Sequence, residues 1–339
     1  MRRFVVVAAL VLLAGPALAK PRGKKAPAEA PTVTAPAAPV AEPTADATAE
    51  PALPTDPLAL ASELGLSMTG RTQLIDAGAG SRAVLGYHPR PGAVATYQTV
   101  ARSKLDLAMS MAGQPFPVPS DAAGVPTVTT VHRHTVAEPR PNGFSVVRIE
   151  QTDASVEGGD AATLAELQRL NGLALDLLVD PSGKPVQVDV SGADPAAVDL
   201  LQQIGDRLVG AMSLFPAEPV GVGARWRIDA QIEMAGMKLD LVELVTARSI
   251  TATTVDLDLA LTMELVDGAV VFPGMPPGMT PQVTKFSGTG GGASHVNLDT
   301  LVATGTTAID LAMGMKIDGP LPMDMSFAVH QVTDITPVD

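Results

Sequence analysis

Two histidines in this sequence have a spacing that could hold a metal ion. His132 and His134 lie two positions apart in a segment, 126–137, that is typical of a β-strand, and alternate residues of a strand project from the same face. Two imidazoles so placed can share one metal ion. The other histidines are scattered, and no acidic residue stands at a recognisable ligand spacing. Metal binding is therefore one hypothesis, beside an ordinary His-x-His pair on a wet strand face.

Pairs of methionines are a second feature with chemical potential. Thioether sulfur is a soft ligand that can bind Cu(I) outside the cytoplasm. Copper sites usually combine Met with His in a loop, whereas the first two pairs below stand in line with Leu and Ile on apolar strand faces. There Met fills a core or lines an adaptable apolar cavity. The pairs are Met109/Met111, Met313/Met315, Met323/Met325, Met234/Met237 and Met275/Met279.

Motifs for catalysis or for a cofactor are missing. The chain contains no Gly-x-Ser-x-Gly, no His-Glu-x-x-His and no cysteine, which argues against nucleophile elbows, zinc-protease helices and thiolate metal sites. The Gly-rich run 288–294 lacks the following helix that a phosphate cradle needs, and it predicts a flexible hairpin turn. The sequence therefore favours a non-catalytic protein without a cofactor and without a metal site of recognisable pattern.

Strict alternation of apolar and polar residues predicts antiparallel strands with one wet face and one dry face. The alternation runs through 104–111, 255–265 and 309–317. Aromatic residues are only 3% of the chain, so a wide sheet would have few large side chains to fill its dry face, and we expect a ligand cavity there. The predicted lining residues are Leu105, Leu107, Met109, Met111, Leu257, Leu259, Leu261, Met263, Leu311, Met313 and Met315.

Helical spacing is found in two segments. In 194–214, Asp194 can cap the N-terminus, Pro195 suits the first turn, and apolar residues recur at helical intervals; a shorter helix is predicted at 160–170. The fold class is therefore α+β, mainly β: a large curved antiparallel sheet, or half-barrel, with one or two helices packed on its concave face. Further strands are predicted near 126–137, 143–156, 173–180, 185–190, 226–234, 237–249, 295–303 and 323–334.

The first residues of the sequence have the parts of an export signal. Basic residues precede an apolar run, 4–13, that is too short to span a bilayer, and small residues favour cleavage after Ala19. We expect the mature protein in the periplasm or outside the cell, with no transmembrane segment after cleavage. The predicted organisation is a signal peptide 1–19, a disordered Pro/Ala-rich tether 20–57, a short helical lead-in 58–82 and an antiparallel β domain 83–339 that contains helix 194–214.

The charge of the chain narrows its partners. Lys and Arg number 23 against 36 Asp and Glu, a net charge of -13, which argues against nucleic acid and anionic lipid surfaces as partners. An outer-membrane barrel normally carries aromatic girdles, and one Trp with two Tyr supplies none. The remaining partners are an apolar ligand or another envelope protein.

The segment 216–226 reads Pro-Ala-Glu-Pro-Val-Gly-Val-Gly-Ala-Arg-Trp. It resembles a P-x-x-P-V-G-V-G-x-x-W element of uncharacterised exported bacterial proteins, in which a helix precedes this loop and an antiparallel strand follows it. The broader layout is similar to periplasmic lipoprotein carriers of the LolA and LppX kind, which implies a curved sheet with helices against it. Physically, Gly221 and Gly223 permit a bend, and we expect Trp226 to open the strand and anchor it to the central helix.

A proline-rich apolar loop, 272–281, can form neither helix nor ladder. Such loops at the end of a sheet often flank a binding site, so we predict Phe272, Met275 and Met279 as rim residues. The leading hypothesis is a non-catalytic exported cell-envelope binding protein that holds a lipid or other apolar ligand between sheet and helix. One alternative is a structural or partner-binding envelope protein with no ligand cavity, and another is a His/Met metal binder.

Overall fold

The computed structural model describes the chain from Ser67 onwards, with gaps. The predicted signal peptide 1–19, the tether 20–57 and the rim residues Phe272, Met275 and Met279 lie outside the described residues. The described residues are 67–111, 113–116, 125–140, 142–159, 161–195, 198, 215–234, 237–267, 280–318 and 322–338.

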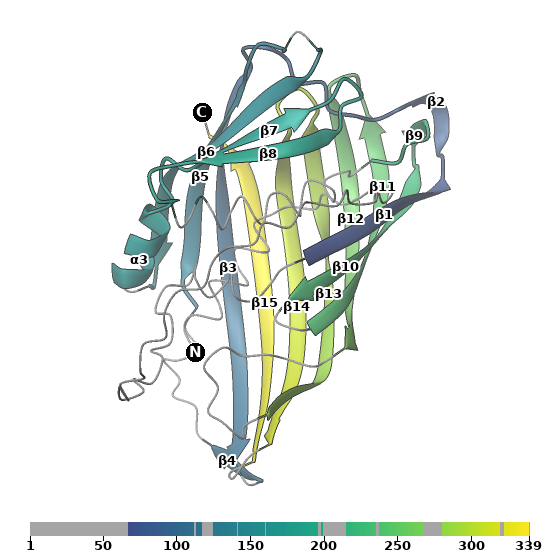
Figure 1. Cartoon of the computed structure of the whole chain (residues 1–339). Helices are drawn as coiled ribbons and strands as arrows, with labels where there is room; N and C mark the ends of the chain where they lie inside the picture. Colours follow the sequence, from purple (N-terminus) through teal and green to yellow (C-terminus); the bar gives the residue numbers. More distant parts are fainter. Residues whose placement is uncertain are drawn as a thin grey trace, which may run out of the picture.

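The architecture is one large antiparallel sheet (Figure 1). Thirteen strands belong to it, in the order β1-β10-β11-β12-β13-β14-β15-β3-β5-β6-β7-β8 with β4 beside β3, while β2 and β9 form a separate two-stranded sheet. The bounds are β1 (Ser67–Asp76), β2 (Ala79–Ala83), β3 (Val94–Met111), β4 (Gln114–Phe116), β5 (Thr127–Val136), β6 (Ser145–Glu157), β7 (Ala174–Val179), β8 (Pro185–Ser191), β9 (Val220–Val222), β10 (Arg225–Met234), β11 (Met237–Ile250), β12 (Thr254–Asp267), β13 (Thr280–Asn297), β14 (Val302–Asp318) and β15 (Met323–Pro337).

The prediction of a mainly-β fold with a large antiparallel sheet is confirmed. The predicted half-barrel is wrong, because the sheet is neither closed nor curled, and its terminal strands β1 and β8 do not pair with one another. The predicted helical lead-in is wrong where it is described, because residues 67–83 form β1 and β2. Strand β1 is held by its ladder to β10, which runs from the Ser67–Glu233 pair onwards, and the folded part therefore begins earlier than the predicted residue 83.

Helices are a small part of the described chain. The prediction at 160–170 corresponds to α3 (Ala161–Gln168), which lies beside β6, where the Gln151 side-chain amide donates to the Leu167 carbonyl at 3.2 Å. Of the predicted helix 194–214, only the start is described: the Val198 N–H donates to the Asp194 carbonyl at 3.0 Å. The packing of that helix on the sheet stays a prediction. Within the described ranges, no helix is both long enough and apolar enough to cross a membrane.

The sheet has two chemically different faces, as the alternation predicts. We call the face that carries Trp226, Val245 and their cross-strand partners the inner face, and the opposite one the outer face. The outer face carries pairs of opposite charge between and along the strands. These pairs make the face hydrophilic, but each contributes little to the free energy of unfolding. These pairs are Arg102–Asp334, Lys104–Asp106, Arg148–Asp176, Arg227–Asp229, Arg248–Asp258 and Lys316–Asp318.

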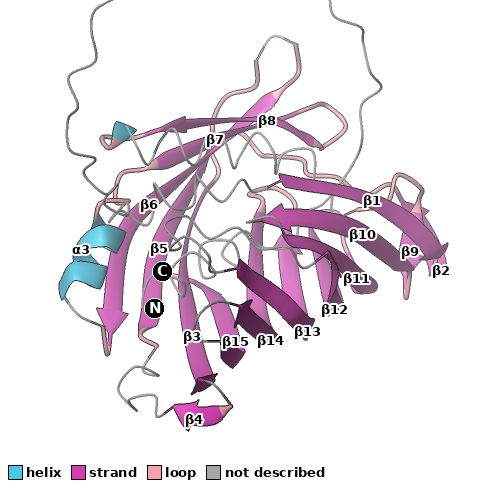
Figure 2. Cartoon of the chain, turned by 60° about the horizontal axis from the view of Figure 1, so that its bottom comes forward, coloured by secondary structure: helices cyan, strands magenta, loops and turns pink. Residues whose placement is uncertain are grey.

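The main hydrophobic core joins the two ends of the sheet. It contains buried side chains of β5–β8 together with buried side chains of β10–β13, and Figure 2 shows these groups of strands at opposite ends of the sheet. The segment after β2 connects them: the Tyr87 N–H donates to the Gly183 carbonyl at 3.0 Å, and the His88 N–H donates to the Leu298 carbonyl at 2.9 Å. A part of the inner face is thus covered by the main hydrophobic core.

The glycine run 288–294 lies within β13 and is not the hairpin turn that its composition predicts. Its glycines are needed where neighbouring backbones come close. A Cβ on Gly292 would lie 2.1 Å from the Thr306 carbonyl oxygen, and one on Gly291 would lie 2.7 Å from the Leu259 carbonyl oxygen. The predicted strand 295–303 is also wrong in its second half, because residues 298–301 form the turn between β13 and β14.

Replacing Gly292 by alanine should destabilise the domain by about 3 kcal/mol, because a backbone rather than a flexible side chain must move. Urea unfolding of the purified domain measures this change. Gly314→Ala on the neighbouring strand β14 is the matched control, since its nearest contact would be the Thr284 hydroxyl at 3.1 Å. Equal losses in the two variants would contradict the close-approach explanation.

Candidate functional site

The inner face of β3, β14 and β15 carries a continuous stripe of apolar side chains. The strand register aligns them: Leu107 lies opposite Phe327, which lies opposite Met313. Side chains on β3 and β15 are half-buried, whereas Met313 and Met315 are buried. We call this the apolar stripe, and its members are Leu105, Leu107, Met109, Met111, Leu311, Met313, Met315, Met323, Met325, Phe327 and Val329.

Most of the predicted cavity residues belong to the apolar stripe or adjoin it. On β12, Leu261 and Met263 continue the inner face beyond the glycines of β13. Leu257 and Leu259 lie instead in the main core, where they are 2% and 8% exposed. The structure therefore brings together the predicted residues of β3, β14 and the second half of β12, and places the first two leucines of β12 in closed packing.

Strand β15 is the part of the stripe that the predicted lining leaves out. It lies between β14 and β3 and so occupies the middle of the stripe. Its sequence carries the same period-two signal as its neighbours, because apolar residues alternate with Asp324, Ser326 and Ala328. Extending the alternation argument to 323–329 would have identified these side chains.

The loop before β10 uses its predicted structural residues for packing. A Cβ on Gly221 would lie 2.4 Å from the Ala79 carbonyl oxygen, so glycine allows β9 to approach β2. Gly223 has a φ of +80°, a conformation that favours glycine. Trp226 is 0% exposed in the main core and lies opposite Val245. These contacts give the loop a structural role.

A network of polar side chains lies on the inner face of β3 and β5. The Tyr97 hydroxyl lies 2.5 Å from His134 Nε2, and His134 Nδ1 lies 2.9 Å from the Thr300 carbonyl oxygen. Since a carbonyl oxygen only accepts, Nδ1–H donates to Thr300 and Nε2 accepts from the Tyr97 O–H. The second histidine, His132, stacks on Tyr97 and lies 2.9 Å from the Thr130 hydroxyl.

This network disfavours the metal hypothesis for His132 and His134. Both imidazoles do project from one face, as predicted, but both ring nitrogens of His134 already have partners within the protein. Burial lowers the pKa of each histidine to about 4, so both are neutral at pH 7. In the described part of the chain, no group of three or more His, Cys, Asp or Glu side chains could hold a metal ion.

Glu243 is a buried acid on the inner face of β11. It is 4% exposed and lies between Ile228 of β10 and Leu261 of β12, neither of which can titrate. No hydrogen bond or ion pair joins its carboxyl group to a described residue. Desolvation raises the pKa of Glu243 to about 7. The sequence contains a signal for this acid. Leu239, Leu241, Glu243 and Val245 are alternate residues of one strand, so the acid falls at a position where the alternation expects an apolar residue.

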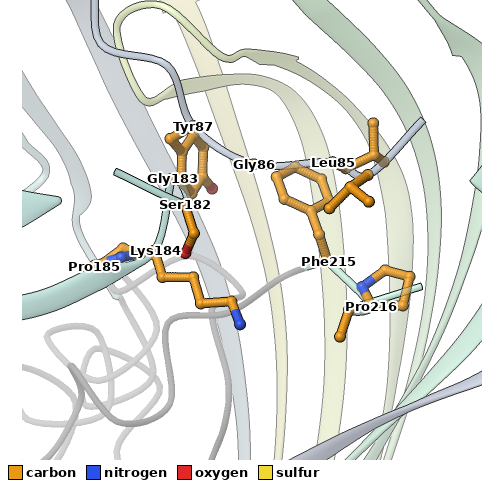
Figure 3. A pocket seen from close by; sticks show the side chains of 11 residues that line it. Leu85, Gly86, Tyr87, Ser182, Gly183, Lys184, Pro185, Phe215 and Pro216 are labelled. Carbon is orange, nitrogen blue, oxygen red and sulfur yellow. The ribbon is translucent and has the colours of Figure 1, made fainter. Parts of the chain in front are cut away.

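A small pocket lies apart from the stripe, beside the connection after β2 (Figure 3). Its volume is about 100 Å³, well below the roughly 300 Å³ at which small-molecule sites begin. The rings of Tyr87 and Phe215 pack at 5.5 Å beside it, and burial raises the pKa of Tyr87. The pocket is a packing gap between the segments 84–87, 182–185 and 215–217.

Fold and site together define a class of molecule: a β domain built on one open, two-faced sheet whose inner face is apolar. No protein-family model matches the chain, and no curated protein sequence matches it. The resemblance to exported bacterial proteins and to lipoprotein carriers therefore stays an expectation.

Replacing Glu243 by glutamine should make stability less dependent on pH. The pKa of Glu243 in the folded state, about 7, lies above its ordinary value of 4.5, so the folded state holds the proton more tightly. Stability is therefore lost as the pH rises from about 4.5 to 7, and E243Q should exceed the wild type by up to about 3 kcal/mol at pH 8.

Urea unfolding at pH 5 and pH 8 measures this gain, with Glu264→Gln on the outer face of β12 as the control. The control should change little at either pH, because Glu264 is exposed. A gain for E243Q that is the same at both pH values would show that the carboxyl group does not titrate between them.

His134 should make the domain weaker in acid. Its pKa of about 4 in the folded state lies below the ordinary 6.5, so the unfolded chain takes up a proton first, and stability is lost as the pH falls through this range. The stability advantage of the wild type over His134→Gln should shrink by about 3 kcal/mol between pH 7 and pH 4.

The titratable side chains that face His134 are Tyr97 and His132. Denaturant unfolding across the pH range measures the effect, and His330→Gln on the outer face is the control because that histidine is exposed. A pH-independent difference between the wild type and H134Q would refute the assignment of a neutral buried His134.

Proposed function

We propose that this protein is a non-catalytic, exported cell-envelope binding protein that holds a lipid or other apolar ligand on the inner face of its sheet. The observation that carries the proposal is the half-buried state of the apolar stripe on β3 and β15. In a two-faced sheet the apolar face ordinarily packs against another layer and becomes fully buried. Side chains such as Leu107 and Phe327 keep a part of their surface accessible, which suits a removable apolar partner.

The chemistry of the stripe supports an adaptable site. Met109, Met111, Met323 and Met325 face inward on neighbouring strands. Methionine is unbranched and polarisable, so it adjusts to ligands of different shape. The binding site is thus suited to flexible chains rather than to one rigid molecule.

The predicted helix 194–214 gives this proposal its geometry. The helix begins after β8, where the Val198 N–H donates to the Asp194 carbonyl oxygen, and Phe215, directly after the predicted helix, is buried in the main core. Phe215 thus belongs to the part of the inner face that the core closes. We propose that the helix covers the inner face and that the ligand lies between helix and sheet, in a protein delivered by the predicted signal 1–19.

Mature protein purified without detergent should contain an apolar molecule that organic extraction and mass spectrometry detect. After extraction, the protein should bind an apolar fluorescent probe such as N-phenylnaphthylamine. Leu107→Asn should weaken that binding by roughly tenfold, because it removes apolar contact area from the stripe.

Ala108→Asn is the matched control, since Ala108 follows Leu107 on β3 and is exposed on the outer face. It should leave probe binding unchanged. Empty extracts over several preparations, together with no probe binding, would contradict the proposal and favour a structural or partner-binding protein.

A further inference from the structure

Among the described strand residues of the large sheet, Glu243 is the single Asp, Glu, Lys or Arg on the inner face, where His132 and His134 are neutral at pH 7. Along β11 the alternation sends Lys238, Asp240 and Arg248 to the outer face and Glu243 to the inner face. On the other strands of the sheet the cross-strand register places each described Asp, Glu, Lys and Arg on the outer face.

The surroundings of Glu243 offer its carboxyl group no partner from the described protein. Ile228 and Leu261 flank it across the strands, while Leu241 and Val245 precede and follow it on the same face. Glu243 is 4% exposed as a whole residue, and a buried acid without a described partner is costly, because buried acids normally have hydrogen bonds or a positive partner. Such a group at a binding face is suited to a partner that arrives with the ligand.

The strand register relates Glu243 to the apolar stripe. The next inward position on β11, Leu241, lies opposite Met263, and that row continues through Gly288 to Leu311 of the stripe. Strands β12 and β13 alone separate β11 from β14 (Figure 2). Since neighbouring strands are about 4.8 Å apart, the distance along the sheet from β11 to β14 is roughly 14 Å, the length of an alkyl chain of about a dozen carbons.

Charge decides which end group suits this position. An amphiphile with an anionic head would meet the like charge of Glu243 and would find no Lys or Arg on the inner face of the described strands. A protonated amine would instead form an ion pair with charge-assisted hydrogen bonds in a dry environment, where such bonds are strong.

We propose that Glu243 binds the protonated amine of an amphiphile whose apolar chain lies along the apolar stripe. The proposal rests on the proposed function, because the stripe must be a ligand site for the amine to be delivered. It adds the ligand class and the orientation: the amine lies over β11, and the chain extends across β12 and β13 towards β14 and β15.

The test uses the full mature protein and three chains of equal length: dodecylamine, dodecanol and dodecanoate. Isothermal titration calorimetry, below the concentrations at which these probes form micelles, measures their affinities. Dodecylamine should bind at least roughly tenfold tighter than dodecanol, and dodecanoate should bind most weakly. Glu243→Gln, which keeps the shape of the side chain, should remove the preference for the amine and leave dodecanol binding within about twofold. Glu264→Gln should change neither affinity, because that acid is exposed on the outer face of β12.

The outcomes separate the two proposals. If dodecanol binds but dodecylamine shows no advantage, or if E243Q keeps the advantage, the role of Glu243 is overturned while the apolar site stands. If none of the three probes binds, both proposals fail.

Discussion

The division of one sheet into a charged face and an apolar face is the constraint on which the rest of this structure depends. Alternate residues of every long strand go to opposite sides, and in this sequence the outward positions are mostly polar while the inward positions are mostly apolar. Sheets of this size cannot leave that surface in water, since apolar area exposed to water costs about 25 cal/mol per Å². The structure therefore covers much of its inner face, and it leaves the apolar side chains of β3 and β15 half-buried.

The molecule covers two parts of this face by different means. In one part, side chains of β5–β8 and β10–β13 share the main core, which Trp226, Val245 and Leu257 fill with almost no exposure. Backbone hydrogen bonds from Tyr87 and His88 hold the connecting segment across it. In the other part, the middle strands β14, β15 and β3 carry the apolar stripe, where Met and Leu predominate and burial is incomplete. The asymmetry separates a part that provides stability from a part that is available for binding.

Much of this arrangement could be predicted from alternation alone, because the period of two is a direct consequence of strand geometry. The faces of β3, β12 and β14 follow from it. The alternation does not predict the structure at two places. The inward positions of β1 include Gly70 and Thr72, which are not large apolar residues. Leu298 continues the apolar pattern of β13 but lies in a turn. That turn is made by the Asn297 side chain, which accepts from the Asp299 and Thr300 N–H groups, and by Leu301 at a φ of +57°.

The glycine run 288–294 shows a second limit to what the local sequence can predict. Composition alone favours a flexible turn, and only the approach of the neighbouring backbones explains why side chains are excluded from this part of β13. Long-range contacts of this kind do not leave a signature in the local sequence. The sequence also does not distinguish Leu257 and Leu259, which lie in the main core, from the other leucines of β12. The core that encloses them includes strands far away in the chain.

Glu243 is an acid at a position that suits an apolar side chain, and the stability of the fold does not explain its presence. Its position between Leu241 and Val245 calls for an apolar side chain, and an unpaired buried carboxyl group disfavours the folded state at neutral pH. Three other buried polar groups of the inner face, His134, Thr130 and Gln331, each have a hydrogen-bond partner. Departures from local rules that leave a group unsatisfied are expected at functional positions. The contrast between a histidine with two hydrogen-bond partners and a glutamate with no partner among the described residues is therefore the strongest reason to look for the ligand's polar group at β11.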